Sequence, residues 1–325
     1  MKLADLGEQG IIELFKKEFE TLKHGNILKS IGDDCAVIRL DDGTCLLVST
    51  DTILQKTHIP REMTPEQIGG YAVNVVLSDI AAMGGEPLGL VFSTALPPDM
   101  DSEFAKRLAK GMAQAAVEKG TCIIGGDTQE AEEIALTGTA FGRVREENLL
   151  LRSGAGVGDL ICTTGELGSA AAGFYCLTNT VSSHPEFVKK ALEPQARLRE
   201  GKILSKYASA CMDISDGLAL SIHEITGQSN VGARIFEDQI PVNLVIKEIE
   251  HITGVSQREM TLYKGGDFEL LFTVAPDRLA GVKKAFDETC AAVSVIGEIT
   301  EKNILLIDEN GCENALEKRG WQTFS

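Results

Sequence analysis

Hydrophobic and polar positions along the chain change repeatedly between a strand-like and a helix-like period. Short apolar runs rich in β-branched residues predict strands at 45–50, 121–124, 133–144, 160–164, 269–275 and 291–299. Apolar residues three and four apart predict helices at 64–84, about 102–119 and 166–177. A further helix is predicted from the polar loop at 178–186 to about Ala208, and an amphipathic helix is predicted at the start of the chain. Strands and helices that alternate in this way indicate an α/β or α+β protein.

The helix predicted at 64–84 has clear start and stop signals in the sequence, and its apolar face contains one polar residue. Thr64, Pro65 and Gln67 form the N-terminal signature of a capping box with proline in the first turn, and glycines end the helix. One face carries Ile68, Ala72, Val75, Asp79 and Met83. Asp79 is therefore expected to project from the buried side, where a carboxylate needs a cation, N–H donors or a raised pKa.

A charged, glycine-rich stretch at 143–159 interrupts the pattern of elements. We place a domain boundary there, which gives an N-terminal domain at 1–145 and a C-terminal domain at 146–325. The length of 325 residues agrees with two domains of ordinary size. Neither half shows a repeat or a low-complexity segment.

Composition narrows the functional classes. A net charge of −17 argues against a nucleic-acid binder, because phosphate contacts need lysine and arginine. No apolar run approaches the length of a membrane span, and the acidic opening helix does not resemble a signal peptide. The eight cysteines lie far apart without a C-x-x-C pair, which argues against zinc and against a disulfide framework. We therefore expect a globular protein of the reducing cytoplasm.

Aspartates recur beside glycine or serine at the ends of hydrophobic runs. They are Asp33, Asp34, Asp51, Asp79, Asp127, Asp213, Asp216 and Asp267. Each has a structural alternative: Asp33 or Asp34 in a turn, Asp127 or Asp216 as a helix N-cap, and Asp79 capping a neighbouring element. As a set they favour several Mg²⁺ ions, which prefer oxygen ligands and bridge carboxylates to substrate phosphates. The chain has no Walker P-loop, so a nucleotide is held in another way.

Seven motifs in register resemble the thiamine-monophosphate kinase family, within the wider AIR-synthetase-like superfamily. They are "GDDCAV", "STDT" with a histidine seven residues after its Asp, "LSDIAAMGG", "GGDT", "LRSGAGVGDL", "MDISDGL" and "GGDFELLF", and the similarity continues to "GWQTF" at the C-terminus. The resemblance implies a two-domain α+β AIR-synthetase-like fold and a homodimer that pairs through its N-terminal sheets. It also implies phosphoryl transfer from ATP to thiamine monophosphate, giving thiamine diphosphate and ADP.

The resemblance further implies roles for individual residues. Magnesium ligands would be Asp33, Thr50, Asp51, Asp79, Asp127, Asp213 and Asp216. ATP would contact Gly126, Asp127, Arg152 and Ser215, and the substrate would contact His58, Asp267 and Trp321. The acceptor is itself an ionised phosphate, so we assign no catalytic general base. For Arg152 a linker salt bridge, for His58 an exposed loop position and for Trp321 a packing role stay open as alternatives.

The sequence departs from the family pattern in four places, all at or near the region expected to bind the acceptor and the metals. They are the segment Gln55–Pro60, Tyr71 where lysine is common, Val76 where asparagine is common, and Gly266 where glutamate is common. Two other functions therefore stay open. One is a paralogous enzyme that uses ATP to activate a different acceptor, and the other is a non-catalytic ATP-binding dimer.

Overall fold

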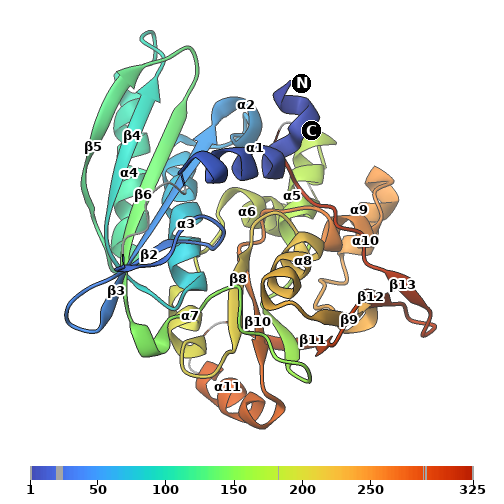
Figure 1. The fold of residues 1–325 in the computed structure, drawn as a ribbon. Helices are drawn as coiled ribbons and strands as arrows, with labels where there is room; N and C mark the ends of the chain where they lie inside the picture. Colours follow the sequence, from blue (N-terminus) through green and yellow to red (C-terminus); the bar gives the residue numbers. More distant parts are fainter. Residues whose placement is uncertain (1, 20–24, 182, 288, 290, 324–325) are drawn as a thin grey trace.

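The computed structural model describes residues 2–19, 25–181, 183–287, 289 and 291–323, which form two sheets with helices packed around them (Figure 1). The first sheet has the strand order β1-β2-β3-β6-β4-β5, and the second has the order β13-β12-β9-β11-β7-β10-β8. Each sheet mixes antiparallel and parallel pairs, with β4–β5 parallel in the first and β9–β12 parallel in the second. The predicted two-domain α+β class is confirmed.

The N-terminal part of the chain forms the first sheet and its helices. Its strands are β1 Ile27–Lys29, β2 Ala36–Arg39, β3 Thr44–Leu54, β4 Glu86–Leu96, β5 Ile123–Glu130 and β6 Ala135–Arg145. Its helices are α1 Leu3–Phe19, α2 Gln55–His58, α3 Pro65–Ala82 and α4 Ser102–Glu118. The helices α3 and α4 pack against each other, and a shared apolar core joins them to β3, β4 and β6.

The C-terminal part forms the second sheet. Its strands are β7 Leu160–Thr164, β8 Ala210–Ile214, β9 Gly232–Phe236, β10 Glu269–Val274, β11 Val293–Thr300, β12 Ile304–Ile307 and β13 Glu313–Ala315. Its helices are α5 Ser169–Thr178, α6 Pro185–Leu192, α7 Leu198–Leu204, α8 Leu218–Ser229, α9 Ile246–Thr253, α10 Gln257–Leu262 and α11 Leu279–Phe286. Short 3₁₀ turns lie at η1 Glu146–Asn148, η2 Glu237–Gln239 and η3 Pro276–Arg278. The first of these directly follows β6, at the predicted domain boundary.

The helix α3 lies between the two sheets and contacts both (Figure 1). It begins with the predicted capping box, in which the Thr64 hydroxyl accepts from the Gln67 backbone N–H and the Gln67 side chain accepts in return. Contacts on both sides bury most of the helix, not a single stripe. The helix α7 approaches α3 so closely that a Cβ on Gly201 would lie 1.9 Å from the Ala81 carbonyl oxygen. The two halves of the chain therefore meet along one buried helix.

Three predicted elements differ from the structure. The strand predicted at 121–124 does not stop at its glycines, because β5 continues through Gly125 and Gly126 to Glu130. The strand predicted at 45–50 likewise continues through Asp51 as β3. The single helix predicted up to Ala208 is two helices, α6 and α7, separated by residues 193–197. In each case pairing or packing with a distant segment overrides the local pattern.

The termini lie together beside the join of the two sheets (Figure 1). The predicted opening helix is present as α1, with a kink at Gly7 and no buried residue. The backbone N–H and the hydroxyl of Thr323 donate to the Glu8 carboxylate at 3.1 and 2.9 Å. Among the described residues, no helix is both long enough and apolar enough to cross a membrane.

We predict that Gly126→Ala lowers the free energy of unfolding, because β5 runs against β4 at this residue. A Cβ on Gly126 would lie 2.0 Å from the Phe92 carbonyl oxygen, so the strands would have to separate. Overpacking of this kind costs about 1–3 kcal/mol. Urea unfolding would measure the loss, with Gly125→Ala as the matched control because its Cβ would meet only the Val91 Cγ1, at 3.8 Å. An equal loss in both variants would contradict the argument from close approach.

Candidate active site

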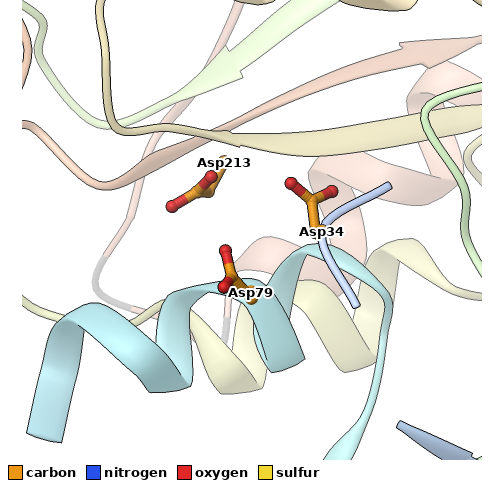
Figure 2. A group of neighbouring side chains, drawn as sticks. All are labelled: Asp34, Asp79 and Asp213. Atoms are coloured by element: carbon orange, nitrogen blue, oxygen red, sulfur yellow. The ribbon is translucent and has the colours of Figure 1, made fainter. Parts of the chain in front are cut away.

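Three aspartates from distant parts of the sequence meet where α3 faces the second sheet. Asp34 precedes β2, Asp79 lies on α3, and Asp213 lies in β8 (Figure 2). One carboxylate oxygen of each lies within 4.8 Å of the others. The side chains point toward a common space between the two halves of the molecule. We call this group the aspartate cluster.

Neighbouring side chains fix the directions of the cluster carboxylates. The Ser78 hydroxyl donates to Asp213 Oδ2 at 2.6 Å, and this contact links α3 to β8. The Ser49 hydroxyl on β3 donates to Asp79 Oδ2. The strand β8 is buried along its whole length and pairs with β10. In this pairing Leu270 of β10 lies directly opposite Asp213. Asp79 and Asp213 thus come from regular elements, α3 and β8, whereas Asp34 lies in the bend between β1 and β2.

Arg152 is the cation that the structure places on the cluster. Its Nε and Nη2 both donate to Asp34 Oδ1, at 3.1 and 2.7 Å. Burial by itself lowers the pKa of Arg152, but the charge and hydrogen bonds of Asp34 outweigh it and raise the pKa above its ordinary value. The second oxygen of the carboxylate, Asp34 Oδ2, is buried and makes no hydrogen bond. Arg152 therefore pairs with one of the three carboxylates, and the buried Asp34 Oδ2 is left without a donor.

Burial and mutual repulsion raise the pKa values of the cluster. The pKa of Asp213 is raised to about 8, chiefly by burial and next by the charge of Asp34. Burial raises the pKa of Asp34 to about 6, and Arg152 opposes that shift. The pKa of Asp79 is raised well above its ordinary value by burial and by the charges of Asp51 and Asp213. The protein alone therefore does not neutralise these groups when all are ionised.

Asp51 and Asp216 lie at the edge of the cluster. Burial raises the pKa of Asp51, and a side-chain hydrogen bond with Asp79 opposes the shift. The pKa of Asp216 is raised to about 7 by burial and then by the charge of Glu8 on α1. Asp216 is not the N-cap that we left open, because α8 begins after Gly217 without a side-chain cap. Both carboxylates remain candidates for ligands.

Asp33 and Thr50 lie differently from the prediction. Asp34 belongs to the cluster, whereas Asp33 Oδ2 lies 3.2 Å from Lys29 Nζ and Asp33 Oδ1 accepts from the Arg152 backbone N–H at 3.2 Å. The Thr50 side chain faces away from Asp51, because successive strand residues point to opposite faces. Its hydroxyl donates to the Gly138 carbonyl oxygen at 3.1 Å. The strand hydroxyl that contacts the cluster is that of Ser49, and a role of Thr50 as a metal ligand stays a prediction.

The residues predicted to contact ATP lie in three places. Arg152 faces the cluster, as described. Gly126 and Asp127 lie on the exposed edge strand β5, where Asp127 Oδ2 accepts from Gln129 Nε2 at 3.1 Å. Asp127 is therefore neither an N-cap nor a member of the aspartate cluster. Ser215 lies in the turn after β8, and its carbonyl oxygen accepts from the Gly266 N–H at 2.8 Å. Their roles toward ATP stay predictions.

The residues predicted to contact the substrate have structural partners of their own. His58 ends α2, and its Nδ1 accepts from the Leu54 N–H at 3.2 Å. Trp321 keeps a side chain that is 45% exposed, while its backbone N–H donates to the Asp216 carbonyl oxygen at 2.9 Å. Asp267 is partly buried, and its two oxygens accept from the Gly168 and Ala170 N–H groups at 2.7 and 3.0 Å.

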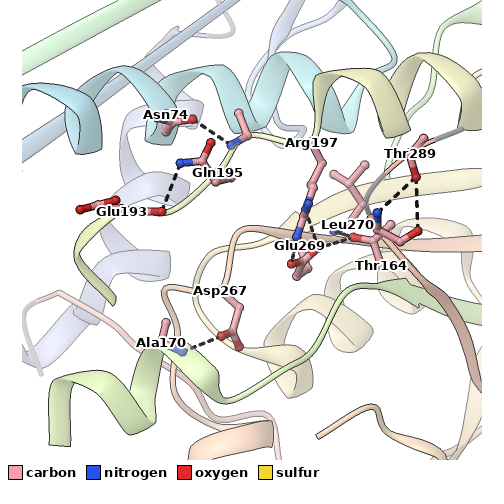
Figure 3. Close-up of polar contacts among 12 residues, drawn as sticks. Asn74, Thr164, Ala170, Glu193, Gln195, Arg197, Asp267, Glu269, Leu270 and Thr289 are labelled. Atoms are coloured by element: carbon pink, nitrogen blue, oxygen red, sulfur yellow. Dashed lines mark hydrogen bonds and ion pairs between the residues drawn. The ribbon is translucent and has the colours of Figure 1, made fainter. Parts of the chain in front are cut away.

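Figure 3 shows how Asp267 points to the start of α5, so both of its oxygens already serve this turn. Close by, Arg197 pairs with the buried Glu269. The Oε2 atom of Glu269 also accepts a hydrogen bond from the Thr164 hydroxyl at 2.6 Å. The structure therefore gives Asp267 a structural role. A contact of Asp267 with the substrate stays a prediction.

The cluster fits a hard divalent cation. Its donors are carboxylate oxygens, which suit Mg²⁺, and it has none of the cysteine or histidine ligands that zinc prefers. The buried Asp34 Oδ2 without a donor is an acceptor still free for a cation. A divalent cation would also relieve the repulsion that raises the three pKa values. The arrangement is therefore suited to hold metal ions against a phosphate-bearing substrate.

Sequence reasoning missed two hydroxyls that orient the cluster. The position of Ser49 could have been predicted from the sequence, because the side chains of a strand alternate between its two faces and so place Ser49 on the same face as Asp51. Ser78 gave no such signal. It is adjacent to Asp79 on a helix and binds a carboxylate 135 residues away in the sequence.

Comparisons with known proteins agree with this architecture. The AIR synthase related protein N-terminal domain matches residues 32–144, and the C-terminal domain of the same name matches residues 156–307. A thiamine-monophosphate kinase of Pyrococcus horikoshii is 38% identical over 320 residues, which are 98% of this chain and 97% of the relative. That of Pyrococcus abyssi is 36% identical over 321 residues, which are 98% and 96%.

A solved structure shares the fold over the whole length. It is AaThiL complexed with AMPPCP and TMP, with a TM-score of 0.88 at 29% identity, and the match covers 99% of both chains. The AIR-synthetase-like form of the two-domain fold, expected from the sequence, is thereby confirmed.

Proposed function

Since the chain belongs to the thiamine-monophosphate kinase family, we propose that its aspartate cluster is the magnesium site of an ATP-dependent kinase. The enzyme phosphorylates thiamine monophosphate, and the products are thiamine diphosphate and ADP. The relative with AMPPCP and TMP bound supports ATP as the co-substrate. The observation that carries the proposal is the convergence of Asp34, Asp79 and Asp213, of which Asp34 and Asp213 are buried and Asp34 alone is hydrogen-bonded to Arg152.

The chain's own residues supply binding, orientation and charge. Asp34, Asp79 and Asp213 would hold the metal, with Asp51 and Asp216 beside them. When bound there, Mg²⁺ would supply the positive charge that a polyphosphate needs. Ser49 and Ser78 keep two of the carboxylates in fixed directions. The acceptor phosphate is already ionised, so no residue has to remove a proton from it.

In this proposal the Arg152 guanidinium has two alternative partners, the Asp34 carboxylate and the polyphosphate of ATP. Without nucleotide it neutralises Asp34. A guanidinium also binds phosphate oxygens with paired N–H donors, and the Arg152 side chain is 22% exposed. We propose that Arg152 contacts the polyphosphate of ATP when a cation has taken over the charge of Asp34. Ser215, Gly126 and Asp127 complete the proposed contacts to ATP, and Asp127 and Asp33 remain proposed metal ligands.

We propose residues from separate segments of the chain as the contacts for the acceptor, thiamine monophosphate. His58 and the half-exposed Trp321 would contact thiamine monophosphate, since an indole ring stacks on aromatic heterocycles. Gly266 has φ of 100°, a conformation that a side chain disfavours, so the loop that contains Asp267 is shaped by glycine at this point.

We also propose a cytoplasmic homodimer, with a domain boundary at 145/146. The seven described cysteines are free, which suits a reducing compartment, while Cys290 lies outside the described residues. The outward face of the N-terminal sheet carries partly exposed apolar residues such as Leu46 and Val48, a surface on which a second copy would pack.

A product assay tests the function directly. Purified protein, ATP and Mg²⁺ are incubated with and without thiamine monophosphate, and thiamine diphosphate and ADP are quantified. We expect equal amounts of both products, formed only when acceptor and Mg²⁺ are present, and none after chelation with EDTA. ADP without thiamine diphosphate would instead indicate a paralogous enzyme with another acceptor. Binding of ATP without any ADP would indicate a non-catalytic dimer.

A further inference from the structure

Phe268 adopts a backbone conformation that is rare for an aromatic residue. Its φ is 50°, in the left-handed region, directly before the buried strand β10. Its N–H donates to the Ile214 carbonyl oxygen at 3.0 Å, so the loop is tied to the end of β8. Strain of this kind costs about 1–3 kcal/mol and persists only where the surroundings impose it. The conformation therefore needs a reason outside the loop.

The side chain of Phe268 supplies that reason, because it leaves the second sheet and enters the core of the first. It is 6% exposed and belongs to the apolar cluster formed mainly by N-terminal residues. Its ring meets Tyr71 on α3 edge to face, with centroids 6.2 Å apart and planes at 89°. Such pairs contribute about 0.5–1.5 kcal/mol beyond the area that they bury. The contact crosses from one half of the molecule to the other.

The same pair lies next to the acidic residues. The pKa of Tyr71 is raised by burial and then by the charges of Asp51 and Asp216, one from each half of the chain. Phe268 is bonded to Ile214, which is the residue after Asp213. Tyr71 lies on the same helix as Asp79, eight residues or about 12 Å away. The aromatic contact thus joins the elements that present the carboxylates of the two halves.

This placement matters because a Mg²⁺ site spanning both halves tolerates little variation in ligand position. Mg²⁺ requires near-octahedral oxygen ligands at about 2.0–2.1 Å. Asp34 and Asp79 come from the N-terminal part and Asp213 from the C-terminal part. Building on the proposed function, we propose that the contact between Phe268 and Tyr71 is a positioning device, which sets the separation of the carboxylates from the two halves.

The test compares the Mg²⁺ dependence of stability in matched variants. Thermal unfolding is followed at increasing Mg²⁺ with a non-hydrolysable ATP analogue present, which gives a half-saturating Mg²⁺ concentration without any turnover. For Phe268→Ala we expect this concentration to rise about 10-fold or more, the scale seen when an outer partner of a metal site is lost. Phe286→Ala is the control, because Phe286 is as deeply buried, at 4%, but belongs to an apolar cluster that, apart from Ala82, is formed by residues of the second half of the chain.

The control variant should unfold at a lower temperature with an unchanged half-saturating Mg²⁺ concentration. The positioning role is overturned if Phe268→Ala also loses stability without any change in that concentration. Phe268→Leu serves where the alanine variant fails to fold, with a smaller rise expected. Phe268→Gly accepts the positive φ but lacks the ring, so wild-type Mg²⁺ dependence in that variant would likewise overturn the role. A wild-type protein without any Mg²⁺ response would overturn the magnesium site itself, which separates the two failures.

Discussion

Asp213→Asn is expected to reduce the rate of thiamine diphosphate formation by about 10²–10³-fold or more, the loss typical of removing one preorganised electrostatic contact to the reacting charge. Asp213 is 3% exposed and contributes one of three converging carboxylates. The amide keeps its size and its contact with the Ser78 hydroxyl but lacks the charge that would hold a metal ion. Steady-state rates at saturating ATP and Mg²⁺ would measure the effect.

The same substitution should act in the opposite direction on the protein without metal. The pKa of Asp213 is raised to about 8 by burial and by Asp34, so its ionised form is unfavourable in the folded state. In EDTA at pH above 8 we therefore expect Asp213→Asn to unfold at a higher temperature than the wild type. Added Mg²⁺ should stabilise the wild type and not the variant.

Asp159→Asn is the matched control, because Asp159 is also buried, at 8%, but lies at the other end of the sheet. Asp213 pairs with Leu270 in β10, whereas Leu160, the residue after Asp159, pairs with Val274. We expect this variant to lose stability and to keep its Mg²⁺ dependence. Near-normal turnover of Asp213→Asn would refute the assignment of the cluster as the metal site.

Arg152→Ala should lower the free energy of unfolding of the metal-free protein by about 3–5 kcal/mol, the usual effect of removing one partner of a buried ion pair. The loss follows because Asp34, whose side chain is fully buried, would have either to hold an unpaired charge beside Asp79 and Asp213 or to take up a proton. Mg²⁺ should restore part of the stability, since it replaces the missing positive charge. Urea unfolding with and without Mg²⁺ would measure both effects.

Activity separates the two roles of Arg152. We expect Arg152→Lys to recover stability better than activity, because an ammonium supplies charge but not the paired donors that suit phosphate oxygens. Arg39→Ala, which breaks the exposed pair between Arg39 and Glu146, is the control and should change stability by less than about 1 kcal/mol. Equal losses in Arg152→Ala and Arg39→Ala would show that Arg152 is only a surface salt bridge.

The sequence alone determined the elements whose signals are local. The capping box at Thr64 and the end of α3 follow from side chains within a few residues of one another, so they were predicted correctly. The aspartates beside glycine and serine were also visible, because a carboxylate in an apolar run needs a partner wherever the chain folds. Hence a convergence of carboxylates was predictable, and the preference of this site for a hard cation stays a prediction.

Tertiary structure decided which members of that set meet. Asp34, not Asp33, enters the cluster, and Asp127 lies on an edge strand outside it, because strand pairing and the approach of α3 to β8 set these positions. Ser49 is the hydroxyl that contacts Asp79, since only the pairing of β3 fixes which face of that strand meets α3. The positive φ of Phe268 has no local signal either, and the ring of Phe268 packs against Tyr71, about 200 residues earlier in the chain. Contacts between segments far apart in sequence carry the free energy that selects one arrangement, and no local pattern contains them.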